Sequence, residues 1–179
     1  MAWKILKNDS ISYMHNDGLI FLRLVELRDA ALILDWETDN GLGRYTERDA
    51  PLTIDFIEAV IKEQRSVFDS GQVRFIICNS HTNMPIGMVD LYNIDFTFES
   101  AEVGIAIVDS KNRRKGVASA ALEEIKEFAA TVLGVCCLRS FVEVDNTPSA
   151  ILFESLGYEI EESNVIRLDK TGNIFKIKF

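Results

Sequence analysis

Residues 101–129, AEVGIAIVDSKNRRKGVASAALEEIKEFA, carry the pattern that decides the fold. They begin with an apolar run at 101–108, which predicts a strand. A loop with four cationic side chains in five residues follows. The apolar residues then recur three and four positions apart, which predicts an amphipathic helix that Gly134 ends. Its stripe is Val117, Ala121, Ile125, Phe128 and Val132. The segment therefore predicts a strand, a basic loop and a helix in direct succession.

The basic loop lies where the helix begins, although a helix N-terminus carries partial positive charge and disfavours cations. The chain is otherwise acidic, with a formal net charge of −9, and the cations of the loop are Lys111, Arg113, Arg114 and Lys115. Gly116 and the small residues after it leave the unpaired N–H groups of the first turn open to another molecule. Such a terminus binds anions, and a pyrophosphate would make both charge terms favourable. The alternative is a solvated basic turn that binds nothing.

The loop lacks both common phosphate-binding motifs, G-x-x-x-x-G-K-[ST] and G-x-G-x-x-G. Residues 113–118 read R-x-x-G-x-A instead, directly after a strand pattern and at the start of a helix pattern. This motif resembles the coenzyme A pyrophosphate loop of the GNAT acetyltransferase superfamily, [Q/R]-x-x-G-x-[G/A]. The resemblance implies that acetyl-coenzyme A is the acetyl donor.

Neighbouring segments extend the resemblance to about residues 18–179 and leave residues 1–17 outside it. VEVDNTPSAILFESLGYE at 142–159 resembles the family's next strand, its N-x-x-x-A segment and its L-G-[FY] ending. IFLRLVELRDAALILDWETD at 20–39 resembles its opening strand and helix. RFIICNSHTNMPIGMVDLYNIDFTFESAEVGIAI at 74–107 is similar to bacterial spermidine and ribosomal-protein N-acetyltransferases.

The order of predicted elements indicates a mixed α/β protein. Short polar loops join the strands at 73–78, 85–94 and 101–108, which predicts an antiparallel meander. The helix after 101–108 leads to a strand at 137–144, so these two strands are expected to run parallel. The other expected strands lie at 18–27, 158–168 and 174–179. The other expected helices are one at 28–36, one that Thr53 caps and Gly71 ends, and one from Asn146 or Thr147 to Leu156. A glycine-bearing loop is expected at 41–50.

The resemblance implies the GNAT arrangement of these elements. In it, a mixed and mostly antiparallel central sheet splays between the fourth and fifth strands, and about four helices flank the sheet. We expect one N-acetyltransferase domain over residues 1–179.

Composition limits the partners and the compartment. A pI near 4.8 argues against a basic face for nucleic acids or anionic membranes, and suits cationic ligands or simple solubility. The three cysteines, Cys78, Cys136 and Cys137, have no metal-ligand spacing and predict reduced thiols, no metal site and a cytoplasmic location. The sequence contains no run of about 18 uncharged apolar residues, so no membrane span is predicted.

Acetyl transfer to a primary amine needs a general base, because an alkylammonium of pKa about 10.4 is neutral in only about one part in 10³–10⁴ at pH 7. Glu102, on the strand before the loop, matches the acidic position that many family members use for this role. The alternative is a strand glutamate in a surface ion pair.

The departing thiolate also needs a proton, and many relatives use a tyrosine in L-Y-E-x-L-G-F as the donor. Here the segment reads L-F-E-S-L-G-Y, so Phe153 takes that position and cannot donate. Tyr158, Tyr92, Ser155 or water could serve, or the step could proceed without an acid.

The resemblance also implies a set of binding residues. The pantetheine arm is expected in the splay, bonded by free backbone groups of Ile107 and Val108. Asn146 is expected to hold the cofactor, to order the strand end or only to cap the next helix. The pyrophosphate is expected at Arg113, Arg114, Lys115, Gly116, Val117, Ala118 and Ser119. Candidate contacts of the acceptor amine are Trp36, Glu37, Asp39, Asp90 and Tyr92, through charge and cation–π interactions.

These observations predict an N-acetyltransferase that acts by direct attack in a ternary complex, on a polyamine-like small molecule or a protein amine. No Ser–His or Cys–His arrangement is visible, although an acyl-enzyme on Cys136 or Cys137 stays open. A non-catalytic acyl-CoA-binding or sensing module is the alternative. Homo-oligomerisation is also left open.

Overall fold

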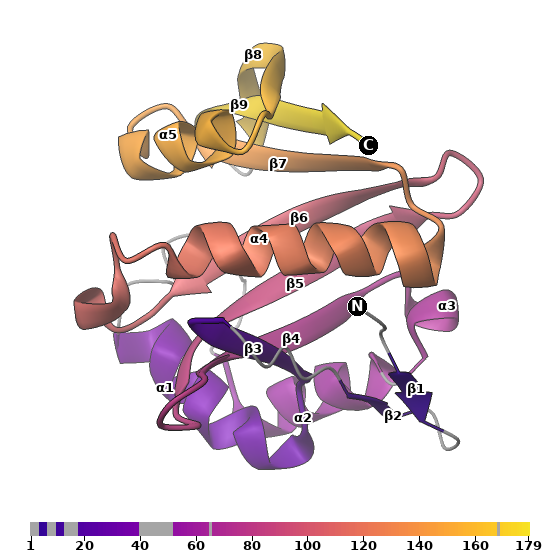
Figure 1. Cartoon of the computed structure of the whole chain (residues 1–179), viewed down its shortest axis with the longest axis vertical. Helices are drawn as coiled ribbons and strands as arrows, with labels where there is room; N and C mark the ends of the chain where they lie inside the picture. The colour runs from indigo at the N-terminus through magenta and orange to yellow at the C-terminus, as the bar shows by residue number, and fades with distance from the viewer. Residues whose placement is uncertain (1–3, 7–9, 13–17, 40–51, 65, 168) are drawn as a thin grey trace.

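The computed structural model describes residues 4–6, 10–12, 18–39, 52–64, 66–167 and 169–179. They form one mixed sheet in the order β1-β2-β3-β4-β5-β6-β7-β9-β8 (Figure 1). The strands are β1 Lys4–Leu6, β2 Ser10–Ser12, β3 Ile20–Leu24, β4 Val73–Asn79, β5 Pro85–Asp95, β6 Ser100–Ile107, β7 Cys137–Glu143, β8 Glu159–Arg167 and β9 Lys170–Lys178. The α-helices are α1 Ala30–Asp39, α2 Ile54–Glu63, α3 Val67–Ser70, α4 Val117–Phe128 and α5 Thr147–Ser155.

The splay between β6 and β7 is confirmed. These two strands are parallel and pair over residues 100–102 and 137–139, after which they separate, while the other neighbouring strands in the described sheet pair antiparallel. Figure 1 shows β7, β8 and β9 diverging from β6 toward the end where α4 begins. The parallel pairing follows from the crossover through α4, as the sequence pattern predicts.

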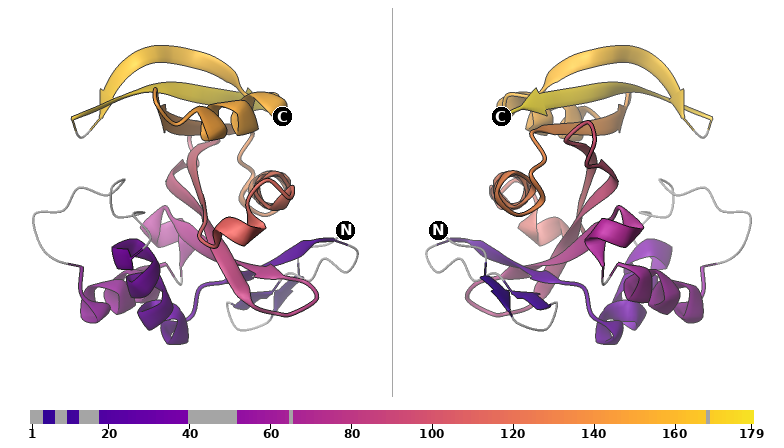
Figure 2. Two further views of the ribbon diagram at one scale, coloured as in Figure 1. Left: turned by 90° about the vertical axis from the view of Figure 1, so that its left-hand side faces the viewer. Right: turned by 90° about the vertical axis from the view of Figure 1, so that its right-hand side faces the viewer.

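Helices cover both faces of the sheet, as the side views show (Figure 2). Alternation along β4 places Phe75 in the core with α4, where its ring meets Phe128 edge-on at 5.0 Å. The next residue, Ile76, lies in a second core with α1 and α2. Because successive strand side chains point to opposite faces, the apolar run at residues 75–78 of β4 fills two cores.

The prediction of one continuous helix between Thr53 and Gly71 is wrong, although Gly71 does end its last turn in the left-handed conformation. Thr53 does cap α2 and accepts a hydrogen bond from the Phe56 N–H at 3.3 Å. The helix ends at Glu63, however, and α3 starts separately at Val67. Ile57 packs in the core with α1, whereas Val67 packs in the core with α4. One straight helix cannot serve both faces of the sheet, so the chain breaks between them.

Other predicted boundaries also shift. The first helix was expected at 28–36, but residues Leu27–Asp29 form a 3₁₀ turn and α1 begins after it and continues to Asp39. Gly134, in the left-handed conformation with φ of 67°, ends the helical segment after a π-helical turn at Ala129–Leu133. β9 begins at Lys170, four residues before the expected start, because the β8–β9 hairpin closes earlier in the chain. The expected loop at 41–50 lies outside the described residues, and no described helix is long and apolar enough to cross a membrane.

Candidate active site

The anion site predicted at the start of α4 has an open backbone. The first helical bond runs from the Ala120 N–H to the Gly116 carbonyl, and no side chain caps the helix. Gly116 has φ of 78°, and a Cβ built on it would meet no atom within 4 Å. The N–H groups of the first turn, at residues 117–119, thus have no capping side chain, and Gly116 before them leaves room for a ligand to approach. A diphosphate fits this arrangement in both charge and access.

The basic loop is folded back on the strand that precedes it. Asp109 accepts a hydrogen bond from the Lys111 N–H at 2.9 Å in a 3₁₀ turn over Ser110–Asn112. Arg114, with φ of 58°, adopts the left-handed conformation before Gly116. Lys111, Arg114 and Lys115 are exposed. The loop thus presents cations around the open helix terminus.

Arg113 has a second function in this loop. Its Nε donates to the Ile107 carbonyl at 3.0 Å and its Nη2 to the Val108 carbonyl at 3.4 Å. The Val108 N–H donates to the Ile86 carbonyl at 3.1 Å. The expectation that Ile107 and Val108 both offer free backbone groups needs correction, because three of these four groups already have partners. The cause is the guanidinium of Arg113, which turns back toward the strand end.

A cavity of about 480 Å³ occupies the splay between β6 and β7. Four of the predicted site residues line it, namely Glu37, Asp90, Tyr92 and Asn146. The lining residues not predicted include Arg74, Gly104, Ser140, Phe141, Glu143, Arg167 and Lys170. The cavity therefore joins side chains from α1, β4, β5, β6, β7, α5 and the β8–β9 hairpin.

Trp36 and Asn146, two of the predicted site residues, also stabilise the fold. Trp36 is buried in the core between α1 and α2. Asn146 caps α5 by accepting a hydrogen bond from the Ser149 N–H at 3.3 Å, which selects it over Thr147 as the cap. Asp39 is the last residue of α1, and its side chain lies outside the described part of the chain.

A partly buried arginine, Arg74, pairs with the two acidic side chains predicted for the acceptor. Arg74 binds Asp90 with two hydrogen bonds, at 2.8 and 2.7 Å, and its Nη1 lies 3.5 Å from Glu37. Burial alone would lower the pKa of Arg74, but the charges of both carboxylates and their hydrogen bonds raise it above its ordinary value. Arg74 therefore stays cationic. A lone arginine in the apolar strand VRFIIC was the available sequence signal.

Glu102 is not among the residues that line the cavity, but its register partner Tyr92 and its ion-pair partner Arg167 both line it. Its Oε2 accepts a hydrogen bond from Arg167 at 2.5 Å, and its Oε1 accepts one from Asn93 at 3.2 Å. The contacts of Glu102 therefore match the alternative prediction of a strand glutamate in an ion pair. The partner, Arg167, comes from the β8–β9 hairpin. The guanidinium of Arg167 also lies 5.5 Å from the centre of the Phe141 ring.

The hydroxyl groups considered as proton donors occupy different places. Tyr158 is buried against Phe153, with ring centres 4.9 Å apart, and its hydroxyl has no partner among the described residues. Ser155 donates to the Leu152 carbonyl within α5. Tyr92 lines the cavity, and burial followed by the nearby charge of Glu102 raises its pKa to about 12. Among the tyrosines in the described part of the chain, Tyr92 is the one that lines the cavity, and its raised pKa keeps it protonated at neutral pH.

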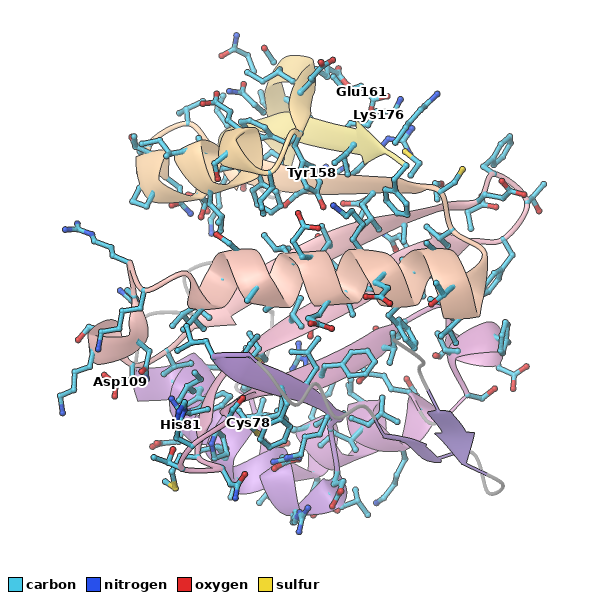
Figure 3. All side chains as sticks on the ribbon, viewed as in Figure 1. Cys78, His81, Asp109, Tyr158, Glu161 and Lys176 are labelled. Carbon is cyan, nitrogen blue, oxygen red and sulfur yellow. The ribbon has the colours of Figure 1, made fainter. Side chains whose placement is uncertain are left out.

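Other reactive groups stand apart from the cavity. Figure 3 shows Cys78 and His81 in the part of the molecule away from Tyr158. Cys78, Cys136 and Cys137 are free thiols, and the cavity lining contains none of them. Among the described residues, no three His, Cys, Asp or Glu side chains gather as a metal site.

Comparisons with known proteins agree with this geometry. The family described as acetyltransferase (GNAT) domain matches residues 20–159. The uncharacterized N-acetyltransferase p20 of Bacillus licheniformis is 28% identical over 141 residues, which span 78% of this chain and 79% of that protein.

Two solved structures share the fold. Spermidine N-acetyltransferase from Vibrio cholerae, in complex with CoA and spermine, has a TM-score of 0.77 at 20% identity, over 89% of this chain and 95% of the other. Ribosomal-protein-S5-alanine acetyltransferase from Vibrio fischeri has a TM-score of 0.78 at 16% identity, over 93% of this chain and 97% of the other. The match over residues 20–159 and the splayed sheet place this chain in the GNAT acetyltransferase family.

Proposed function

We propose that this protein, as one domain over residues 1–179, is an acetyl-CoA dependent N-acetyltransferase that moves the acetyl group to a primary amine by direct attack. The observation that carries the proposal is the cavity in the splay between β6 and β7, because the two strands diverge toward the end of the sheet where the uncapped, cation-flanked helix α4 begins (Figure 1). One molecule with a diphosphate and an extended arm can occupy both. Family membership supports the choice of coenzyme A as that molecule.

The donor site divides into a charged part and an extended part. The N–H groups of Val117, Ala118 and Ser119 would bind the diphosphate, with Gly116 leaving room for its approach. Arg114 and Lys115 supply the charge, while Arg113 holds the strand end in place and lends its positive charge from there. The pantetheine arm lies along β6 in the splay. Asn146 orders the end of β7 beside it by capping α5.

The acceptor must lose a proton, which costs about 4 to 5 kcal/mol for an ordinary alkylammonium at pH 7. Glu102 is the proposed base, acting directly or through one water molecule. Arg167 and Asn93 fix the orientation of its carboxylate. The amine would then attack the thioester from the side of the sheet that α1 and α2 cover, where Glu37, Asp90 and Tyr92 line the cavity.

The acceptor class is a polyamine-like small molecule or a protein amine. Both kinds occur among the similar structures, since one binds spermine and another is named for the alanine of ribosomal protein S5. One related spermidine N-acetyltransferase is dodecameric, which supports a homo-oligomer here as well. The reduced cysteines and the lack of a membrane-spanning helix among the described residues fit the cytoplasm.

Release of free thiol from acetyl-CoA, measured with a panel of polyamines, monoamines and peptides, tests the proposal. We expect turnover that depends on the amine. The double variant Arg113→Ala, Gly116→Glu should weaken CoA binding at least tenfold, because it removes a cation and adds a carboxylate at the diphosphate site. Tight CoA binding without turnover on any amine would indicate an acyl-CoA-binding module instead. Unchanged CoA affinity in the double variant would disprove the loop assignment.

A further inference from the structure

Acetyl transfer leaves a thiolate that must gain a proton, while the amine must lose one. On the basis of the proposed acetyl transfer, we propose that Tyr92 gives its proton to the departing thiolate and that Glu102 returns a proton to Tyr92. The two residues would then form a relay that carries the proton of the amine to the sulfur. In the complete reaction, a carbon–nitrogen bond forms and the carbon–sulfur bond of the thioester breaks. Tyr92 and Glu102 return to their starting protonation states.

The strand register brings the two residues of the relay together. Tyr92 on β5 and Glu102 on β6 are direct partners in the antiparallel ladder. A Cβ built on Gly104 would lie 3.5 Å from Cε1 of Tyr92, so the ring extends along β6 across this glycine. Tyr92 and Gly104 both line the cavity. The phenol therefore reaches from the ladder position of Glu102 into the space proposed for the thioester.

Other groups in the cavity are less suited to donate. Arg74 and Arg167 are bound to carboxylates, and arginine stays protonated at any relevant pH. Lys170 lies 3.3 Å from Glu143 in a third ion pair. Ser140 and Ser149 also line the cavity, but they lie on β7 and α5, across the splay from Glu102. Tyr92 is the hydroxyl that the ladder pairs directly with the proposed base.

The order of proton movements follows from relative acidity. A phenol with a pKa of about 12 is a weaker acid than a thiol of roughly 8.5, so its proton would not move to the thiolate unaided. A carboxylic acid is a far stronger acid than a phenol, so return of a proton from Glu102 makes the combined transfer favourable. The charges that face the phenol are those of Glu102, Arg167 and Asp90, with Arg74 and Glu37 behind Asp90. Arg167 offsets the carboxylates and limits the cost of a transient phenolate.

The central experiment compares Tyr92→Phe with Tyr158→Phe in single-turnover acetyl transfer. Both changes remove one phenol oxygen, but Tyr158 lies outside the cavity lining and its hydroxyl has no partner among the described residues. We expect Tyr92→Phe to lose about 100-fold in rate, with CoA affinity within about twofold of wild type. The solvent deuterium isotope effect should also disappear. Tyr158→Phe should keep both the rate and the isotope effect.

A double-mutant cycle with Glu102→Gln tests the link between the two residues. Members of one relay act as a unit, so the double variant should be about as slow as the slower single variant. Losses that multiply would contradict the relay. A slow Tyr92→Phe that keeps the wild-type isotope effect would show that the phenol only positions Glu102, and would also overturn the proposal. If the wild-type protein released no thiol with any amine, acetyl transfer itself would fail, a result distinct from these.

Discussion

Arg167 binds Glu102 at 2.5 Å, although 65 positions separate the two residues in the chain. Arg167 is the last residue of β8, and its register partner Lys170 binds Glu143 on β7. The β8–β9 turn thus attaches to β6 through one ion pair and to β7 through the other. The hairpin holds the two sides of the splay at the place where the proposed base lies.

Arg167→Met should reduce turnover, because the change removes the group that orients Glu102 and anchors the hairpin to β6. We expect kcat to fall on the order of tenfold, with CoA affinity unchanged. Arg28→Met is the control. It breaks an ion pair of similar length, to Glu26 at 2.8 Å, whose residues do not line the cavity. Equal kcat values in the two variants would show that Arg167 has no special part in the reaction.

Gly116→Ala and Gly134→Ala should separate stability from binding. Both glycines have positive φ, of 78° and 67°, and a Cβ on either would meet no atom within 4 Å. Each change should therefore cost about 1 to 2 kcal/mol of unfolding free energy from backbone strain alone. Gly116→Ala should also weaken CoA binding, because its methyl group stands before the open N–H groups. Isothermal titration would contradict the anion site if both variants bound CoA equally well.

Arg74→Met should be strongly destabilising. The substitution removes the guanidinium that pairs with Asp90 and Glu37 at a partly buried site. Removing one partner of a buried ion pair costs about 3 to 5 kcal/mol, measurable as a lower midpoint in urea. Adding Asp90→Asn should recover part of the loss, since it removes the carboxylate that Arg74 binds with two hydrogen bonds. No recovery in the double variant would mean that Arg74 acts through packing alone.

The ion pairs on the outer hairpin should give an acid-dependent stability term. Hydrogen bonds from Arg139 and then Lys176 lower the pKa of Glu161 from 4.5 to about 2. A depressed carboxyl pKa stabilises the fold above the unfolded value and loses this effect as the pH falls toward 2. The difference in unfolding free energy between wild type and Glu161→Gln should be constant above pH 5.5 and shrink below about 4.5. Because Glu161 is near the surface, the difference should stay under about 1 kcal/mol.

The parts of the fold that follow from local pattern could be predicted from the sequence. The strand, loop and helix at 101–129 have their own periodicity, glycine and cap signals, and the crossover dictates the parallel pairing. The break between α2 and α3 could not be seen, because it reflects which face of the sheet each segment covers. Ile57 and Val67 both fit one helical stripe in the sequence and pack in different cores.

Some residues of the candidate site could be predicted from the sequence, and others could not. Asp90, Tyr92 and Asn146 were found from residue type and family position. Arg74 and Arg167 were missed, because their partners are set by strand register rather than by spacing along the chain. The β4–β5 ladder pairs Arg74 with Asp90 directly. A cation in an otherwise apolar strand predicts a carboxylate partner on a neighbouring strand, because a charge placed there needs a partner. The sequence alone could therefore have indicated that Arg74 forms an ion pair.

The short ladder between β6 and β7 leaves part of each strand edge unpaired inside the sheet. Three residue pairs join these strands, and the rest of each inner edge is left without a neighbouring strand. Exposed strand edges in proteins are normally covered or paired. In the proposed function, the amide-bearing arm of the donor takes the place of the missing strand, so the protein would be most resistant to local opening when its acetyl donor is bound.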